Sequence, residues 1–313
     1  MRIFANPSYN FIRWRWHALV LSVVIIWAGV AAVVYGHRLS LGIEFTGGTA
    51  LTVKYAEPVD ESRIRAAVDP IAKQAIVQRL EGNKVMIRLP RMAEQTTGTA
   101  LENDAERVEA ALKAAGLGNY AENPSREIIG PVIGADLQRK GVWATLTALG
   151  GILVYVAFRF RFTFAVGAIV AAFHDILICV TMLAFFHYDL TLNIVAALLT
   201  ITGYSVNDTI VVFDRVRENQ RMLRREPLDR LVNLSVNQTL GRTVITSGVT
   251  FLAVLALYIF GGEVLRGFAF TMLVGVITGT YSTVFIAAAI AIILSRPSPA
   301  APVAQAQAKP KRA

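Results

Sequence analysis

The chain has 313 residues, of which 54% are hydrophobic, and its formal net charge is +9. This composition, with a mean hydropathy of +0.50, excludes an ordinary soluble domain and indicates a protein that spans a membrane. The one cysteine excludes an intramolecular disulfide.

Six apolar runs are long enough, or nearly so, to cross a hydrocarbon layer of about 30 Å. They cover residues 18–35, 142–158, 162–186, 190–213, 244–260 and 268–294. The first is longer than the core of a cleaved signal peptide, so we expect a retained anchor. Arginines gather near the N-terminus, in the loop between the fourth and fifth runs and in the tail. This positive-inside pattern predicts that both termini are cytoplasmic, and it argues against nucleic-acid binding.

Between the first two runs lies a long segment with equal numbers of acidic and basic residues. Its patterns predict, in order, a strand over 49–55, a helix over 60–71, strands over 75–80 and 84–89, a helix over 103–115 and a strand over 125–129. Gly82 and Asn83 suit a tight turn between the middle strands, and residues 103–106 have capping-box spacing. The order β-α-β-β-α-β suggests a small ferredoxin-like domain outside the cytoplasm.

The expected fold is therefore an α-helical polytopic membrane protein with six transmembrane helices and a small α+β periplasmic domain between helices 1 and 2. The expected parts are an N-terminal tail with helix 1 (1–36), the periplasmic domain (37–140), a five-helix transmembrane block (141–295) and a disordered cytoplasmic tail (296–313). The tail is rich in proline and alanine, ends in basic residues and could touch anionic lipid.

Asp208 is the most informative single residue, because a charged side chain within a membrane helix costs several kcal/mol and is usually kept for function. It lies about 7–8 Å from the cytoplasmic end of its run. Arg242 opens the next run on the same side. A nearby guanidinium favours the ionised carboxylate and desolvation the neutral one, so the pair forms a candidate proton switch. The alternative is a static ion pair that fixes helix register.

Further polar residues accompany this pair. Those expected to support it are Tyr204, Ser205, Asn207, Thr209 and Thr246, the last in a stripe with Arg242 and Thr250. His174 and Asp175 lie in the middle of the third run, where a secondary relay role and a structural role remain equally open. Gly47 and Gly48 suggest a structural turn.

Several kinds of site find no support in the sequence. It lacks the spacings of phosphate-binding glycine loops, of zinc-binding HExxH or CxxC motifs and of the GxSxG nucleophile. We therefore expect no metal, no cofactor and no hydrolytic activity of the chain's own, with a proton gradient as the energy source.

Five segments together resemble the SecF family, the smaller membrane subunits of the bacterial SecD–SecF export complex. They are LGIEFTGGT (41–49), GPVIGADL (130–137), FHD (173–175), GYSVNDTIVVFDRVREN (203–219) and NQTLGRTVITSG (237–248). The resemblance implies half of an RND-like transporter in the bacterial inner membrane, completed by SecD. It also implies that the proton-motive force helps polypeptides leave the SecYEG channel, and it assigns the acid to Asp208 and the arginine to Arg242.

The implied partners are SecD, the SecYEG channel, YidC, exported unfolded polypeptides and anionic lipid. One competing hypothesis is a subunit of a proton-driven RND small-molecule exporter, for which the external segment is small. Another is an intramembrane aspartyl protease using Asp175 and Asp208. Their different depths argue against it, because paired carboxylates that share a proton must lie within a few ångströms.

Overall fold

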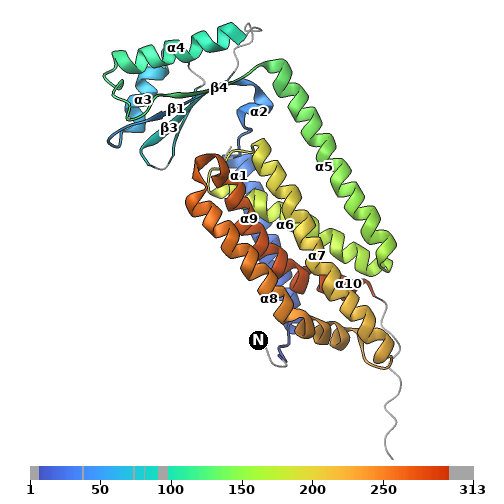
Figure 1. Cartoon of the computed structure of the whole chain (residues 1–313). Coiled ribbons are helices and arrows are strands. Elements are labelled where there is room, and N and C mark those ends of the chain that lie inside the picture. Colours follow the sequence, from blue (N-terminus) through green and yellow to red (C-terminus); the bar gives the residue numbers. More distant parts are fainter. Residues whose placement is uncertain (1–6, 37–38, 73–74, 81, 91–97, 296–313) are drawn as a thin grey trace, which may run out of the picture. The chain divides into compact units, whose positions relative to one another are not determined.

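The computed structural model describes residues 7–36, 39–72, 75–80, 82–90 and 98–295. The chain divides into two compact units. The helical unit comprises residues 1–38, 148–188 and 196–313, and the sheet unit comprises residues 39–147 and 189–195. Each is described by itself below, because their relative placement is not determined (Figure 1).

The sheet unit contains a four-stranded antiparallel sheet with the strand order β2-β3-β1-β4. Its elements are α2 (Ile43–Thr46), β1 (Gly48–Lys54), α3 (Glu61–Val68), β2 (Ile76–Arg79), β3 (Lys84–Pro90), α4 (Gly98–Ala114) and β4 (Ser125–Ile129). The two longer helices, α3 and α4, lie over the same face of the sheet (Figure 1). From β1 onward, the elements follow the β-α-β-β-α-β order expected from the sequence.

Local chemistry explains most element ends in this unit. Asp60 caps α3, because its carboxylate accepts a hydrogen bond from the backbone N–H of Ser62. The Ser62 side chain and, to a smaller extent, this backbone N–H lower the pKa of Asp60. Gly82 and Asn83 have φ values of 69° and 60°, as a tight turn between β2 and β3 requires. The prediction that α4 starts at residue 103 is wrong, since the helix begins at Gly98 and the capping-box spacing falls inside it.

Burial follows the apolar periodicity of the sheet unit. Side chains from one face of the sheet and from both helices form its core, and the fully buried ones are Leu51, Val53, Ile64, Val68, Ile87, Val108 and Leu112. The period of two on β1 and the helical period on α3 and α4 therefore place the apolar side chains on facing surfaces, as amphipathic elements require.

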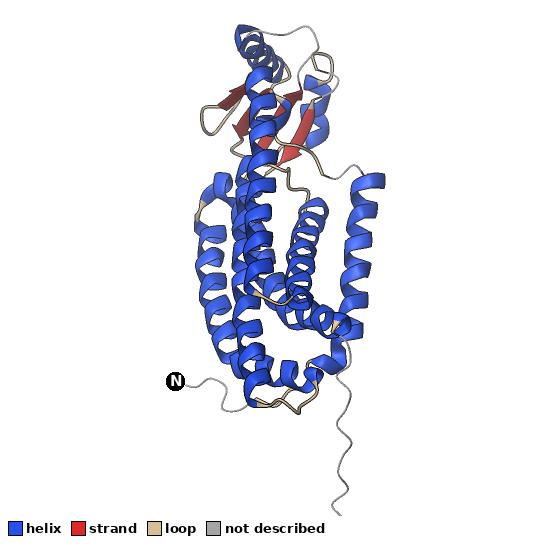
Figure 2. Ribbon diagram, turned by 90° about the vertical axis from the view of Figure 1, so that its right-hand side faces the viewer, coloured by secondary structure: helices blue, strands red, loops and turns tan. Residues whose placement is uncertain are grey.

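Among the residues that the structure describes, six helical spans are long and apolar enough to cross a membrane, which confirms the predicted number. The helices are α1 (Arg15–Gly36, after the short turn η1, Ile12–Trp14), α5 (Pro131–Arg159), α6 (Phe162–Phe185), α7 (Leu192–Met222), α8 (Leu228–Phe260) and α9 (Gly262–Ser282). The last span continues through the π turn η2 (Thr283–Ala287) into α10 (Ala288–Leu294). Figure 2 shows the helical and strand-containing parts by colour.

Two helices extend well beyond their apolar runs. α5 begins at Pro131, eleven positions before its apolar run at 142, so the GPVIGADL segment is its first part. The basic loop expected between the fourth and fifth runs is mostly the end of α7 and the start of α8, with residues 223–227 between them. The positive charges there therefore lie largely on helices.

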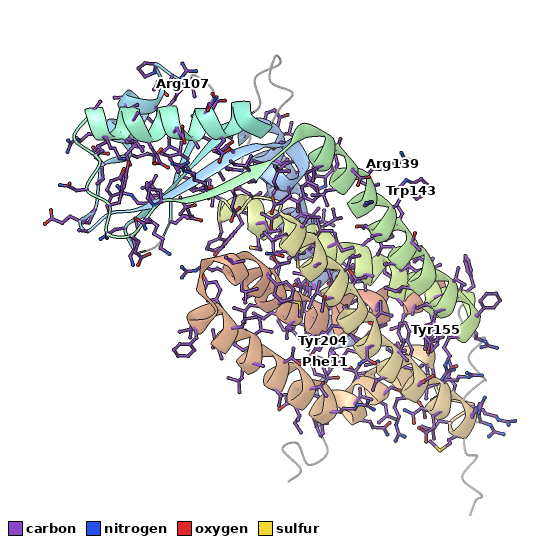
Figure 3. All side chains as sticks on the ribbon, turned by 45° about the horizontal axis from the view of Figure 1, so that its top comes forward. Phe11, Arg107, Arg139, Trp143, Tyr155 and Tyr204 are labelled. Atoms are coloured by element: carbon purple, nitrogen blue, oxygen red, sulfur yellow. The ribbon has the colours of Figure 1, made fainter. Side chains whose placement is uncertain are left out.

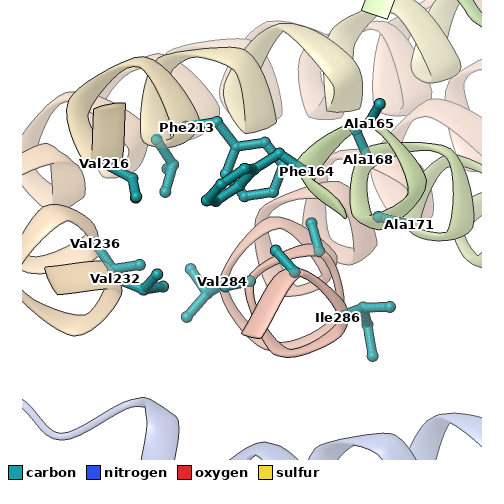
Figure 4. Close-up of a cluster of buried hydrophobic side chains, with 14 of the residues drawn as sticks. Phe164, Ala165, Ala168, Ala171, Phe213, Val216, Val232, Val236, Val284 and Ile286 are labelled. Carbon is teal, nitrogen blue, oxygen red and sulfur yellow. The ribbon is translucent and has the colours of Figure 1, made fainter. Parts of the chain in front are cut away.

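Alanine and valine side chains, with Phe164 and Phe213, form most of a buried core cluster in the helical unit. Phe164 on α6 and Phe213 on α7 pack edge to face, with ring centroids 5.0 Å apart (Figure 4). On the same stretch of α6, a Cβ built at Gly167 would lie 2.6 Å from the carbonyl oxygen of Ala287. A glycine there lets α6 and the π turn approach closely, as small residues do between membrane helices.

Candidate functional site

Asp208 faces α8 from the buried side of α7. Its side chain is 7% exposed, and its Oδ1 accepts a hydrogen bond of 3.1 Å from the Thr243 hydroxyl. The other carboxylate oxygen, Oδ2, is buried and has no partner among the described residues. A buried ionised oxygen without a donor is costly, whereas a protonated one carries no charge. Asp208 is therefore a carboxyl group with one oxygen fixed and one free to take a proton.

The structure does not join Asp208 and Arg242 by an ion pair. Arg242 is exposed, and its guanidinium makes no hydrogen bond or ion pair with any described residue, although it lies within electrostatic range of Asp208. The residue that contacts the acid is Thr243, one position further along α8. The two predicted switch residues thus lie near one another. The group that binds the Asp208 carboxylate is the Thr243 hydroxyl rather than the Arg242 guanidinium.

The rotation of α8 about its own axis explains why Thr243, and not Arg242, contacts Asp208. Every fourth residue of α8 is buried, beginning before its apolar run: Leu231, Ser235, Thr239, Thr243 and Ser247. This row of residues is the inward face of α8. The stripe expected at Arg242, Thr246 and Thr250 lies off this buried face, with Arg242 and Thr246 exposed. The Thr246 and Thr250 hydroxyls instead donate to carbonyls of their own helix.

A second polar contact continues the α7–α8 seam one turn away from Asp208. The Tyr204 hydroxyl donates to Ser247 Oγ at 3.1 Å, and Thr280 on α9 donates to the same oxygen at 2.8 Å. Figure 3 shows Tyr204 on α7, among the helices of this unit. Tyr204 therefore lies on the same face of α7 as Asp208, as expected, but its partner is a hydroxyl cluster rather than the acid.

Asp175 is the most completely enclosed acid among the described residues, with 0% exposure. Its Oδ2 accepts hydrogen bonds from Ser205 on α7 and from Ser282 on α9, the latter at 2.8 Å. Its Oδ1 lies 3.0 Å from His174 Nδ1. Both oxygens are partnered, in contrast to those of Asp208. Adjacent positions on α6 thus share one hydrogen-bonded cluster, although helix geometry alone pointed them apart.

The hydrogen bonds of His174 lead on to α1. Tyr281 donates to the Ala18 carbonyl at 2.8 Å, so its oxygen is left to accept from Ser22, 3.2 Å away. Ser22 must then accept from His174 Nε2, at 2.9 Å. Because Nε2 donates to Ser22, one proton lies between His174 Nδ1 and Asp175 Oδ1. The two groups are then either an imidazolium and a carboxylate or a neutral imidazole and a neutral carboxylic acid. The cluster joins α1, α6, α7 and α9.

The polar residues predicted around Asp208 therefore divide between two faces of α7. Ser205 contacts Asp175, and Thr209 shares a 2.9 Å hydrogen bond with Thr283 on the far side from α8. Asn207 is exposed. The functional candidates that the sequence did not single out are Ser22, Thr243, Ser247, Thr280, Tyr281 and Ser282. Of these, only Thr243 and Ser247 are marked in the sequence, by hydroxyl residues spaced four apart on α8.

The predicted glycine turn lies in the sheet unit, where Gly47 and Gly48 have φ values of 68° and 131°. Both are backbone conformations that favour glycine. A Cβ built at Gly134, on the first turn of α5, would lie 3.0 Å from the Gly47 nitrogen. The turn thus supports a close backbone approach. Within the described ranges, no group of three or more His, Cys, Asp or Glu side chains is placed to hold a metal ion.

Comparisons with known proteins agree with one another. The family model described as protein export membrane protein SecD/SecF, C-terminal, matches residues 108–297, and the SecD/SecF GG motif matches residues 34–59. A protein translocase subunit SecF from Rhodothermus marinus is 38% identical, over 94% of this chain and 96% of its own length. The SecF of Escherichia coli O157:H7 is also 38% identical, over 91% of this chain and 88% of its own.

A longer relative contains the same region as part of a fusion. SecDF of Thermus thermophilus is 38% identical over 92% of this chain, which spans 38% of that protein. The crystal structure of SecDF, a translocon-associated membrane protein from Thermus, matches with a TM-score of 0.80 at 36% identity. This chain covers 39% of the crystallised one.

Proposed function

Because this chain belongs to the SecD/SecF family of protein export membrane proteins and is a subunit of the Sec translocase, we propose that Asp208 couples the proton-motive force to export. The observation that carries the proposal is the enclosed carboxyl group, with Oδ1 bound by Thr243 and Oδ2 unpartnered. An acid held in this way can change its charge without losing its one hydrogen bond. Arg242 lies within electrostatic range of that charge.

The mechanism is a two-state rearrangement at the α7–α8 seam. Ionised Asp208 attracts Arg242 and favours approach of the two side chains, whereas protonated Asp208 loses that attraction. One proton crossing 100 mV supplies about 2.3 kcal/mol, and each pH unit adds about 1.4 kcal/mol. These energies are enough to shift a two-state equilibrium strongly, provided that the two charge states prefer different arrangements.

His174 and Asp175 take a secondary role in this proposal. Their cluster satisfies both carboxylate oxygens and holds one shared proton at the junction of four helices. Changing its charge would break several hydrogen bonds at once. We therefore assign the cluster to holding α1, α6 and α9 together while the α7–α8 seam moves, with the hydrogen bond from Ser205 as its contact to α7.

SecD is the partner that the fused relative supports, since that protein carries this region within a SecDF chain. Our proposal extends the partners to the SecYEG channel, YidC and unfolded polypeptides. It places the protein in the bacterial inner membrane with both termini cytoplasmic and the sheet unit periplasmic, on the basis of the positive-inside pattern. The chain serves transport without a hydrolytic site or cofactor of its own.

Anionic lipid is a further proposed partner. The C-terminal tail expected to bind it lies outside the described residues, but a cavity of about 580 Å³ lies between the N-terminal segment and the start of α8. Its lining includes Arg13, Arg15 and Arg230, with Trp16 beside them. Arginines next to an interfacial tryptophan suit a phospholipid phosphate at the cytoplasmic surface.

The experiment that tests the proposed function measures secretion of a reporter from cells carrying Asp208→Asn, with the membrane abundance of this subunit and SecD. We expect secretion to fall to the level of cells that lack the subunit, at normal abundance. Asp136→Asn, which neutralises an exposed acid on α5, is the matched control and should secrete normally. Normal secretion by a stable Asp208→Asn variant would overturn the proposal. Drug sensitivity with intact secretion would instead favour a small-molecule exporter.

A further inference from the structure

The segment before α2 binds the connection between α6 and α7. We call the contacting residues Ser40, Leu41, Gly42 and Arg88 the seat. The backbone N–H of Leu190 donates to the Ser40 carbonyl at 2.8 Å, and that of Gly42 donates to the Leu190 carbonyl at 2.8 Å. Leu41 and Leu190 thereby form a parallel bridge. All of these residues belong to the sheet unit. The connection is therefore held by strand-like pairing.

A buried ion pair fixes this connection to the sheet itself. Arg88, on β3, is 6% exposed, and its Nη2 lies 2.8 Å from Asp189 Oδ1. The Ser40 hydroxyl donates to the same oxygen. The Arg88 guanidinium also donates to the Leu41 carbonyl and to Gln78 Oε1, each at 3.4 Å. Arg88 thus binds β2, the segment before α2 and the α6–α7 connection at once.

Two acids, Glu127 and Asp189, lie within electrostatic range of Glu44, as does this arginine. Burial raises the pKa of Glu44, and its own backbone hydrogen bond lowers it. The negative charges of Glu127 and Asp189 then raise this pKa, and the positive charge of Arg88, the weakest of these effects, lowers it. Arg88 therefore offsets only part of the unfavourable charge on Glu44. The geometry of its hydrogen bonds places Arg88 at the centre of the seat.

The seat continues directly into the helix that carries Asp208. Thr191 caps α7, since its hydroxyl accepts from the Ile194 N–H and its carbonyl from the Val195 N–H. α7 then runs without a break from Leu192 to Met222. Asp208 lies about 24 Å along this helix from its first residue, at 1.5 Å per residue. Residues up to 195 belong to the sheet unit and those from 196 to the helical unit.

We propose that Arg88 and Asp189 are the positioning pair through which displacement of α7 is transmitted to the sheet unit. This inference rests on the proposed function of Asp208. An uninterrupted helix carries displacement along its axis, and a buried ion pair with three further donor contacts keeps its first residues on the sheet. Loss of the pair would let α7 respond to protonation without moving the sheet.

The test compares Asp189→Asn and Arg88→Gln with Arg126→Gln in the complete complex with SecD. Arg126 is the matched control because its 2.7 Å ion pair with Glu109 also stabilises the sheet unit but does not touch the seat. Three quantities are measured: secretion of a reporter, membrane abundance, and the infrared carboxyl band that Asp208→Asn removes. We expect at least a fivefold loss of stimulated secretion in the two seat variants, with normal abundance and an unchanged Asp208 titration, and normal secretion in the control.

A covalent replacement separates transmission from folding. Leu41→Cys with Leu190→Cys, in a Cys179→Ala background, places two cysteines on the bridged pair, where strand neighbours suit a disulfide. Oxidation should restore secretion to Asp189→Asn, and reduction should remove it again.

Normal secretion by Asp189→Asn would overturn this inference while leaving the role of Asp208 intact. Loss of the Asp208 titration in the same variant would also overturn it, because the pair would then support the fold of α7 rather than transmission. Normal secretion by Asp208→Asn would instead reject the proposed function, so the two failures are distinct.

Discussion

Two buried acids, Asp175 on α6 and Asp208 on α7, differ in how completely their oxygens are hydrogen-bonded. On the face toward α6 and α9, Asp175 has both oxygens bound by serines and a histidine. On the face toward α8, Asp208 has one oxygen bound by Thr243 and the other unpartnered. The more deeply buried acid is therefore the better satisfied one. On our proposal, the free bonding capacity of the carboxyl group, rather than its depth, identifies the acid that exchanges a proton.

The largest effect should come from removing the charge of the less satisfied acid. Asp208→Asn keeps the shape and the acceptor for Thr243 but cannot ionise, so export stimulation should be lost with little change in stability. Pulse-labelled secretion with quantified membrane abundance checks this. A variant that disappears from the membrane would contradict the assignment of Asp208 to function rather than to folding.

Breaking the better satisfied acid should mainly affect stability. Asp175→Ala removes the acceptor of two serine hydroxyls and the partner of His174, and hydrogen bonds to charged groups contribute about 1.5–3 kcal/mol each. We expect several kcal/mol of destabilisation, seen as a lower melting temperature in detergent. Wild-type thermal stability with lost export would reverse the roles of the two acids.

Removing the hydroxyl on Asp208 should give an intermediate effect. Thr243→Val keeps the side-chain shape but leaves Asp208 Oδ1 without its donor. Export should fall several-fold, less than in Asp208→Asn, and its dependence on external pH should change. Thr243→Ser retains the hydroxyl and should stay close to wild type. Thr246→Val is the second control, because that hydroxyl bonds to its own helix; an equal loss in Thr246→Val would contradict the observed phase of α8.

The smallest effect concerns the sheet unit. Burial raises the pKa of Glu44, so its neutral form is favoured in the folded state. The contribution of neutral Glu44 to the free energy of unfolding is fully present below the ordinary pKa of 4.5. It is lost as pH rises through the raised pKa of the folded state. Glu44→Gln should therefore flatten this pH dependence and stabilise the unit slightly at neutral pH. Thermal melts across this pH range check the sign, and an unchanged pH profile would contradict it.

Sequence periodicity predicted the elements of the fold well. The six spans and the order of the strands and helices from β1 to β4 follow from apolar spacing, and the turn at Gly82 and Asn83 follows from residue type. The start of α4 was not predicted correctly, because Asn103 and Glu106 have the spacing of a capping box although both lie inside the helix. The apolar run that begins at residue 142 did not predict the start of α5 at Pro131, because the helix extends beyond its apolar part.

The site was less predictable because it depends on helix rotation and on distant residues. The sequence singled out Asp208, His174 and Asp175, but an error of one position on α8 exchanges Arg242 for Thr243 on the carboxylate. Ser22 and Tyr281 are 259 positions apart, and no local pattern joins them. Asp189 lies in a short connection, where its pairing with Arg88 had no signal in spacing.

The central claim is that Asp208 exchanges a proton while Asp175 stays fixed. Infrared difference spectroscopy of the complex in membranes, stepped in pH, measures the carboxyl groups directly, with Asp208→Asn and Asp175→Asn to identify each band. The account predicts a titrating carboxyl band that disappears in Asp208→Asn and remains in Asp175→Asn. A titrating band that survives in Asp208→Asn and vanishes in Asp175→Asn would contradict it.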